Sequence, residues 1–106
     1  MKRVRTNACW GFFSTLSNPT RVAILVLLEE KPRNVGELAR ELKQEQSMVS
    51  HNLSPLVRCR FVFVKKHGKE RIYSLNKKTM APLFKIIYKH MGSNCPGRSV
   101  CTCPLQ

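Results

Sequence analysis

The sequence predicts one mainly α-helical domain with a single small β-hairpin. Apolar residues recur at helical spacing before residue 58 and after residue 77, and the stretch between is β-branched and aromatic. With 106 residues and 42% hydrophobic content, the chain is long enough for one core. We expect the folded domain over residues 1–92. Residues 93–106, SNCPGRSVCTCPLQ, are expected to form a tail with few apolar side chains to pack.

A central helix is expected over residues 18–30, NPTRVAILVLLEE. Asn18 suits its N-cap, Pro19 suits its first position, and Pro32 ends it. Its apolar run covers more than one face, which predicts a buried position. A helix is also expected before it, in ACWGFFSTLS, although Gly11 lowers the helix propensity there.

Two short helices joined by a polar turn follow. In NVGELARELK, Asn34 and Glu37 have the spacing of a capping box, ahead of an apolar stripe. In SMVSHNLSPLVR, one face is apolar and the other carries Ser47, Ser50, His51 and Ser54. This pattern indicates a helix-turn-helix, whose second helix contacts DNA through its N-terminal residues. Pro55 lies inside the second helix, so we expect either a kink or an end near Leu53.

A basic β-hairpin and a last helix complete the domain. FVFVKKHGKERIYSL breaks at His67-Gly68, which predicts two strands and a turn. Cations that suit a sugar-phosphate backbone gather at the hairpin tip, namely Lys65, Lys66, Lys69 and Arg71. KKTMAPLFKIIYKHMGS again has apolar residues at helical spacing, and Gly92 is expected to end it.

The net charge of +13 is unevenly distributed. From residue 46 onward, Glu70 alone opposes eleven lysines and arginines. This asymmetry favours a polyanionic partner, with a solvated lysine-rich surface as the alternative, and it does not separate DNA from RNA or anionic lipid. The sequence has no apolar run near 18 residues and no signal-peptide pattern. We therefore expect a cytoplasmic protein with reduced thiols and no membrane partner.

Four stretches, in the same order, resemble the ArsR-type winged helix-turn-helix repressors. LSNPTRVAILVLL is similar to the family's opening, GELAREL to its E-L-A helix, SMVSHNLSPLVRCRFV to S-x-V-S-x-H-L-x-x-L-x-x-x-G-L-V, and KKHGKERIYSLN to its wing. The resemblance covers about residues 14 to 91. It implies a homodimer formed through the first and last helices. It also implies binding to palindromic operators, with release when a metal, metalloid or oxidant reaches a thiol or imidazole site.

The resemblance also implies which residues contact DNA. These are Gln46, Ser47, Ser50 and His51 on the second helix, and Lys66, Lys69 and Arg71 on the wing. Ser50 could instead bond back to its own helix, and His51 could be a solvated surface side chain. Where the family has a small residue and glycine, this chain has Cys59 and Arg60. We expect Cys59 to be buried and the turn after it to be made differently.

The family's usual metal sites are missing. Asn34 to Ala39 stand where its C-V-C-D-L-A run would be, and the last helix offers His90 alone. Three thiols remain in the tail, Cys95, Cys101 and Cys103. Three soft thiolates suit trivalent arsenic or antimony, whereas zinc would need a fourth ligand, for which Cys9 is a candidate. The alternatives are a disulfide formed under oxidant and an idle tail.

The function predicted from the sequence is therefore a DNA-binding repressor released by a thiophilic ion at the tail cysteines. The alternative is a redox-responsive or non-sensing winged-helix protein with structural zinc or idle thiols. An enzyme is not expected, because the sequence shows no catalytic triad order, phosphate loop or paired buried carboxylates.

Overall fold

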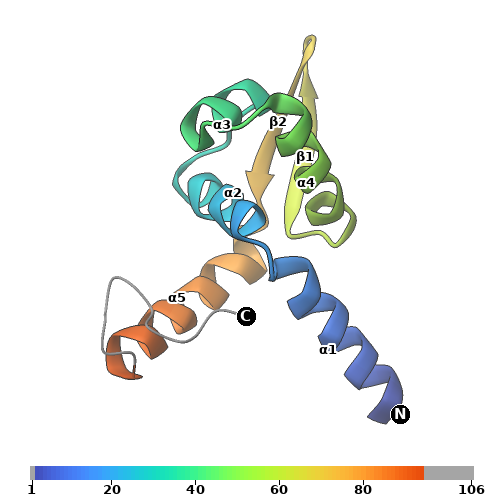
Figure 1. Ribbon diagram of the computed structural model, residues 1–106, viewed down its shortest axis with the longest axis vertical. Helices are drawn as coiled ribbons and strands as arrows, with labels where there is room; N and C mark the ends of the chain where they lie inside the picture. The colour runs from blue at the N-terminus through green and yellow to red at the C-terminus, as the bar shows by residue number, and fades with distance from the viewer. Residues whose placement is uncertain (1, 95–106) are drawn as a thin grey trace. The chain divides into compact units, whose positions relative to one another are not determined.

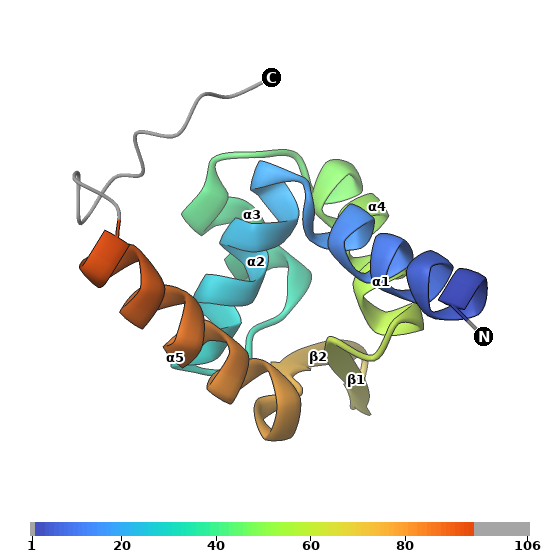
Figure 2. The same cartoon turned by 90° about the horizontal axis from the view of Figure 1, so that it is seen from below.

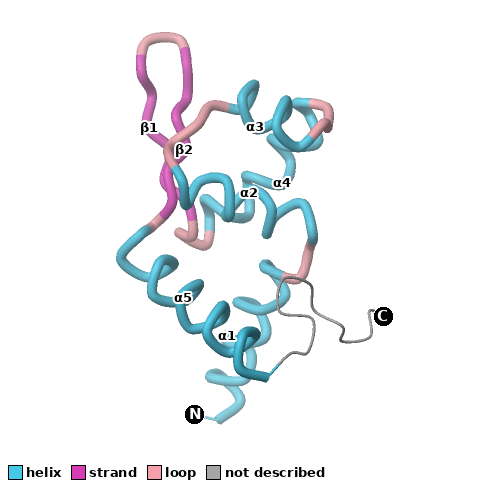
Figure 3. The backbone as a smooth tube through the Cα atoms, turned by 90° about the vertical axis from the view of Figure 1, so that its left-hand side faces the viewer, coloured by secondary structure: helices cyan, strands magenta, loops and turns pink. Residues whose placement is uncertain are grey.

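The computed structural model describes residues 2–94, with side chains described from residue 6 onward. Its elements are α1 (Lys2–Leu16), α2 (Pro19–Glu30), α3 (Val35–Leu42), α4 (Gln46–Arg58), β1 (Val62–His67), β2 (Glu70–Leu75) and α5 (Lys77–Asn94). The predicted class, mainly α with one hairpin, is confirmed (Figure 3). The chain divides after Asn76 into two compact units, α1 to β2 and α5.

The first two helices follow from local sequence. The Asn18 side chain accepts a hydrogen bond from the Arg21 backbone N–H at 3.1 Å, so the predicted cap opens α2. Ile24, Leu25 and Leu28 of α2 are fully buried, but Val22 and Val26 of the same apolar run are 39% and 36% exposed, so the predicted burial holds for only part of the run. α1 forms in spite of Gly11 and extends away from the other helices of its unit (Figure 2). Phe12 of α1 and Phe61 pack edge to face, with ring centroids 5.0 Å apart.

α3 and α4 form the helix-turn-helix. The capping box of Asn34 and Glu37 is present, and the α3 residues Leu38 and Ala39 are buried. α4 continues through Pro55 to Arg58, so of the two alternatives given for Pro55 the helix does not end near Leu53. Proline removes only one backbone hydrogen bond there. The buried side chains on either side of it, Leu53 and Leu56, hold this part of the helix in the core.

The end of α4 corrects two expectations. The N–H of Phe61 bonds to the carbonyl of Leu56 at 2.9 Å and the N–H of Arg60 to that of Val57 at 3.0 Å. These are the two bonds of a Schellman motif, in which Arg60 takes the left-handed conformation (φ 62) that glycine usually supplies. The turn is therefore an ordinary Schellman turn, with Arg60 in the position that glycine usually takes. Cys59 is exposed, not buried, because this turn leaves it at the surface end of the helix.

The wing is a two-stranded antiparallel hairpin, paired from Val62 opposite Leu75 to His67 opposite Glu70. Its two-residue turn begins with Gly68, whose φ of 66 is a value that favours glycine. At its base, Tyr73 and Arg33 exchange backbone hydrogen bonds of 2.9 and 3.0 Å. The hairpin is thus fixed to the linker before α3, while its tip projects from the helices of its unit (Figure 1).

α5 forms the second unit. Its buried side chains are Met80 and Phe84, and the Phe84 and Tyr88 rings stack with centroids 6.0 Å apart. The helix passes Gly92 and reaches Asn94, whose side chain donates to the His90 carbonyl at 3.1 Å. Gly92 was therefore wrongly expected to end the helix. Among the described helices, none alone has the length and apolarity to cross a membrane. Thr6–Leu16 and Pro19–Glu30 together have sufficient length and apolarity, but they are bent by 80° relative to each other.

Candidate nucleic-acid interface

The four predicted α4 residues all lie on the exposed side of the helix. Gln46, Ser47, Ser50 and His51 are exposed. The opposite side is buried in the core through Val49, Leu53 and Leu56. Glu45, the N-cap, makes no side-chain hydrogen bond to the first turn. Within the described residues, Ser50 also makes no hydrogen bond to its own helix, so its hydroxyl is available to a partner.

The wing cations divide between the two faces of the hairpin. Lys66 lies directly opposite Arg71, on the face that carries Val64 and Tyr73. Lys65 lies on the other face, because side chains alternate along a strand. Lys69 occupies the two-residue turn. The cluster expected at the tip is therefore two groups of cations and not one.

A surface hollow brings four of the seven predicted DNA contacts together. Gln46 and Ser50 of α4 line it from one side, and Lys69 and Arg71 of the wing line it from the other. Ser47 lies at a different hollow, beside Met48 and Lys43. The start of α4, the start of α3 and the wing thus line one hollow, whose cations are Arg40 of α3 and Lys69 and Arg71 of the hairpin.

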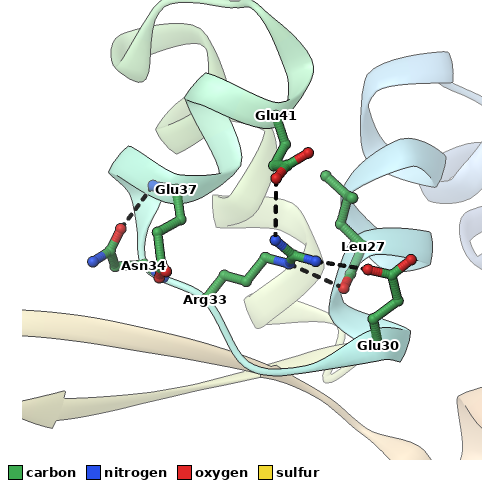
Figure 4. Close-up of polar contacts among 6 residues, drawn as sticks. All are labelled: Leu27, Glu30, Arg33, Asn34, Glu37 and Glu41. Carbon is green, nitrogen blue, oxygen red and sulfur yellow. Dashed lines mark hydrogen bonds and ion pairs between the residues drawn. The ribbon is translucent and has the colours of Figure 1, made fainter.

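Arg33, which the sequence analysis did not identify, connects the elements behind this surface: α2, α3 and the wing (Figure 4). Its residue is only 7% exposed. Its guanidinium donates to the Leu27 carbonyl at 3.2 Å and to the Glu30 carboxylate at 2.7 Å, and lies 3.7 Å from the Glu41 carboxylate. Arg33 thereby joins the last turn of α2 to α3. Its backbone pairs with Tyr73, so one residue also positions the wing.

Asn34 connects the start of α3 to the wing. Its side-chain oxygen accepts from the Glu37 N–H at 2.8 Å, and its own N–H donates to the Glu37 carboxylate at 2.9 Å. Its side-chain nitrogen donates to the Glu70 carboxylate. Glu70, which stands between Lys69 and Arg71, therefore has a hydrogen bond inside the protein. The capping box was visible in the sequence, but its partner in the wing was not.

Asn52 is the buried polar residue of α4, only 5% exposed. Its side-chain oxygen accepts from the Arg21 guanidinium at 3.1 Å, and its nitrogen donates to the Met48 carbonyl at 3.0 Å. Arg21 also donates to the Thr15 carbonyl at 3.2 Å. Asn52 stands where the resembled signature has histidine. Asn52 thereby connects α4 to the junction of α1 and α2. The Arg21 guanidinium makes its hydrogen bonds within the protein.

The predicted metal ligands Cys95, Cys101 and Cys103 lie outside the described residues. The two described cysteines, Cys9 on α1 and Cys59, are free and exposed. Over the part of the chain that the structure describes, no three His, Cys, Asp or Glu side chains are placed to hold a metal ion.

The fold, with an exposed α4 beside a basic hairpin, is that of a winged helix-turn-helix DNA-binding regulator. Residues 18–63 match the family model described as "Bacterial regulatory protein, arsR family". An uncharacterized HTH-type transcriptional regulator of Mycobacterium tuberculosis, Rv0081, is 38% identical over 79 residues, 74% of this chain and 69% of that protein. The chain belongs to the ArsR family of transcriptional regulators. The prediction that it is not an enzyme is thereby confirmed.

Two further comparisons agree. The crystal structure of Rv0081 has a TM-score of 0.81 at 32% identity, covering 90% of this chain and 96% of that one. A probable mercury resistance operon repressor of Streptomyces lividans is 30% identical over 91 residues, which cover 86% of this chain and 73% of that protein. The similarity therefore extends beyond the helix-turn-helix itself.

Proposed function

We propose that the protein is a homodimeric repressor that binds an operator through α4 and the wing. The observation that carries this proposal is the hollow where Gln46, Ser50, Lys69 and Arg71 meet. It combines hydrogen-bonding groups that suit base edges with cations that suit phosphates. The net charge of +13 supports the same partner.

The dimer is supported by apolar side chains that each terminal helix exposes. Trp10 and Phe13 of α1 are 73% and 64% exposed, and they lie three residues apart on one side of the helix. Ile86 and Tyr88 of α5 are also exposed. Exposed aromatic side chains of this kind are typical of an interface. Light scattering of the reduced protein should give twice the chain mass of 12.2 kDa, and a monomer at micromolar concentration would contradict the dimer.

The proposed signal is a thiophilic ion bound by Cys95, Cys101 and Cys103. Soft thiolates select soft ions such as trivalent arsenic or antimony. Zinc would take a fourth ligand, and the exposed Cys9 is the candidate. The relative named as a probable mercury resistance operon repressor supports an ion of this class. Ion binding would restrain the last helix and favour a dimer whose α4 helices do not match half-sites about 34 Å apart.

Fluorescence anisotropy on DNA from the protein's own upstream region tests this proposal. Arsenite, mercuric ion, zinc and a mild oxidant are added in turn to the reduced protein. We expect one class of agent to release the DNA. The triple variant Cys95→Ser, Cys101→Ser, Cys103→Ser should keep DNA binding and lose the response, and Cys59→Ser is the matched control. An ion response that persists in the triple variant would contradict the tail site.

A further inference from the structure

A second hollow lies between the C-terminal half of α4 and the wing. Among the residues that line it are Ser50, Ser54 and Arg58 of α4 and Arg71 of β2. Val64 and Tyr73 of the hairpin are also part of its wall. Arg58 and Ser54 belong to none of the DNA contacts that the sequence predicted.

No carboxylate lines this hollow, and neither Arg58 nor Arg71 forms an ion pair or side-chain hydrogen bond with the side chains described, residues 6–94. Glu70, which precedes Arg71, instead accepts a hydrogen bond from Asn34. Arg33 is the contrast, because Glu30 and Glu41 both lie beside its guanidinium. Arg71 also lies opposite Lys66 on the hairpin, and like charges in that position repel.

We propose that this hollow binds a phosphate group of the DNA backbone, held by Arg58 and Arg71 with Ser54 as a hydrogen-bond donor. Guanidinium groups fit phosphate oxygens with two parallel hydrogen bonds, and serine hydroxyls add further donors. The inference deepens the proposed operator binding and rests on it. It adds Arg58 and Ser54 to the interface as residues that position the protein on the duplex.

The length of α4 fits this assignment. Ser47, His51, Ser54 and Arg58 follow one another at spacings of four, three and four residues, so they share one side of the helix. Eleven residues at about 1.5 Å each separate Ser47 from Arg58 by roughly 16 Å. The major groove is about 12 Å wide. A helix that reads bases from its first turns therefore carries its last turn to the edge of the groove, where the backbone lies.

The test compares Arg58→Ala with Lys31→Ala, which removes the same charge from an exposed position at the end of α2. Each is titrated with specific and scrambled duplexes over a range of salt concentrations. We expect Arg58→Ala to weaken both duplexes about tenfold. The slope of log affinity against log salt should fall by about one. Lys31→Ala should leave the slope unchanged, and both variants should keep the unfolding temperature of the wild type.

Methylphosphonate substitution then identifies the source of the phosphate. One uncharged methylphosphonate linkage in the duplex should weaken DNA binding by the wild type and leave DNA binding by Arg58→Ala unchanged. If Arg58→Ala matches Lys31→Ala in affinity and slope, the site is refuted while operator binding stands. If wild type binds no duplex, the proposed function itself fails. If inorganic phosphate competes with DNA for wild type but not for Arg58→Ala, and no linkage shows the effect, the hollow holds a free anion and the backbone assignment is wrong.

Discussion

The two helices of the helix-turn-helix differ in where their polar side chains find partners. In α3, Asn34 and Glu37 bond to each other's backbone, and Glu41 lies beside the buried Arg33. In α4, Ser47 and Ser50 are exposed, and neither hydroxyl has a hydrogen-bond partner within the described residues. Asn34, Glu37 and Glu41 therefore already have polar partners inside the protein. α4 presents donors and acceptors that remain available to another molecule.

This difference means that substitutions in the two regions should change different measurements. A buried polar group that loses its partner reduces folding stability, because desolvation is no longer offset. An exposed polar group on α4 should change DNA affinity with little effect on folding, since surface substitutions usually change stability by less than about 0.5 kcal/mol.

The largest expected effect is the loss of folding stability on replacing Arg33, which connects α2 to α3. Arg33→Ala removes hydrogen bonds to Leu27 and Glu30 and leaves space in the packing between α2 and α3. We expect the free energy of unfolding in urea to fall by about 2–3 kcal/mol. Glu30 is exposed, so the ion pair itself contributes little. Arg40→Ala, on the exposed side of α3, is the control. If the free energy of unfolding of Arg33→Ala falls by less than about 0.5 kcal/mol, Arg33 does not stabilise the packing of α2 and α3.

Asn52→Ala tests the buried side of α4. It deprives the Arg21 guanidinium of an acceptor and the Met48 carbonyl of a side-chain donor. We expect a loss of about 1.5–2 kcal/mol in thermal or urea unfolding. Ser54→Ala, two residues away on the exposed side, should be close to neutral in the same assay. Equal losses from the two substitutions would show that the two sides of α4 do not differ.

Arg60→Gly tests the cap after α4. Arg60 holds a φ of 62, and its backbone carbonyl accepts from the Asn76 side chain at 2.8 Å. Glycine adopts this conformation without steric cost but loses more entropy on folding. We expect a net gain of about 0.5–1 kcal/mol, measured as a higher unfolding temperature. A lower unfolding temperature would mean that the arginine side chain stabilises the turn.

The smallest effect is expected at Glu70, which bonds to Asn34 and lines the same hollow as Lys69 and Arg71. Glu70→Gln keeps an oxygen that accepts from Asn34 and removes a negative charge beside Lys69 and Arg71. Its DNA affinity should rise about two- to threefold at low salt. Glu70→Ala loses the bond to Asn34, so the wing is held less firmly and the gain should disappear. Identical affinities for the two variants would rule out a positioning role for this bond.

The features that the sequence predicted are local ones. Caps at Asn18 and Asn34, the period of α4 and the break at Gly68 depend on neighbours a few residues away. Arg33 and Asn52 could not be found this way, because their partners come from other elements and a charged or amide side chain usually suggests solvent. Cys59 was misplaced for the same reason, since its exposure depends on the turn that Arg60 makes.

The exposure of the predicted DNA contacts on α4 could be read from the sequence, because it follows the period of the helix. Gln46, Ser47, Ser50 and His51 are where that period places them. The convergence of Gln46 and Ser50 with Lys69 and Arg71 involves the wing, which the backbone bridge between Arg33 and Tyr73 fixes. This bridge joins segments forty residues apart and leaves no local pattern in the sequence. The hollow with Arg58 was missed because a basic residue in the last turn of a helix is usually explained by the helix dipole.

The most direct measurement compares DNA affinity and folding stability in one variant of the exposed surface. Ser50→Ala, His51→Ala and Arg71→Ala are combined, and the protein is titrated with its upstream duplex at about 0.1 M salt, where surface charges act over about 10 Å. We expect the affinity to fall at least a hundredfold, from about 1 kcal/mol or more per contact, and the unfolding temperature to stay unchanged. A triple variant that binds the duplex as tightly as wild type would contradict DNA binding through α4 and the wing.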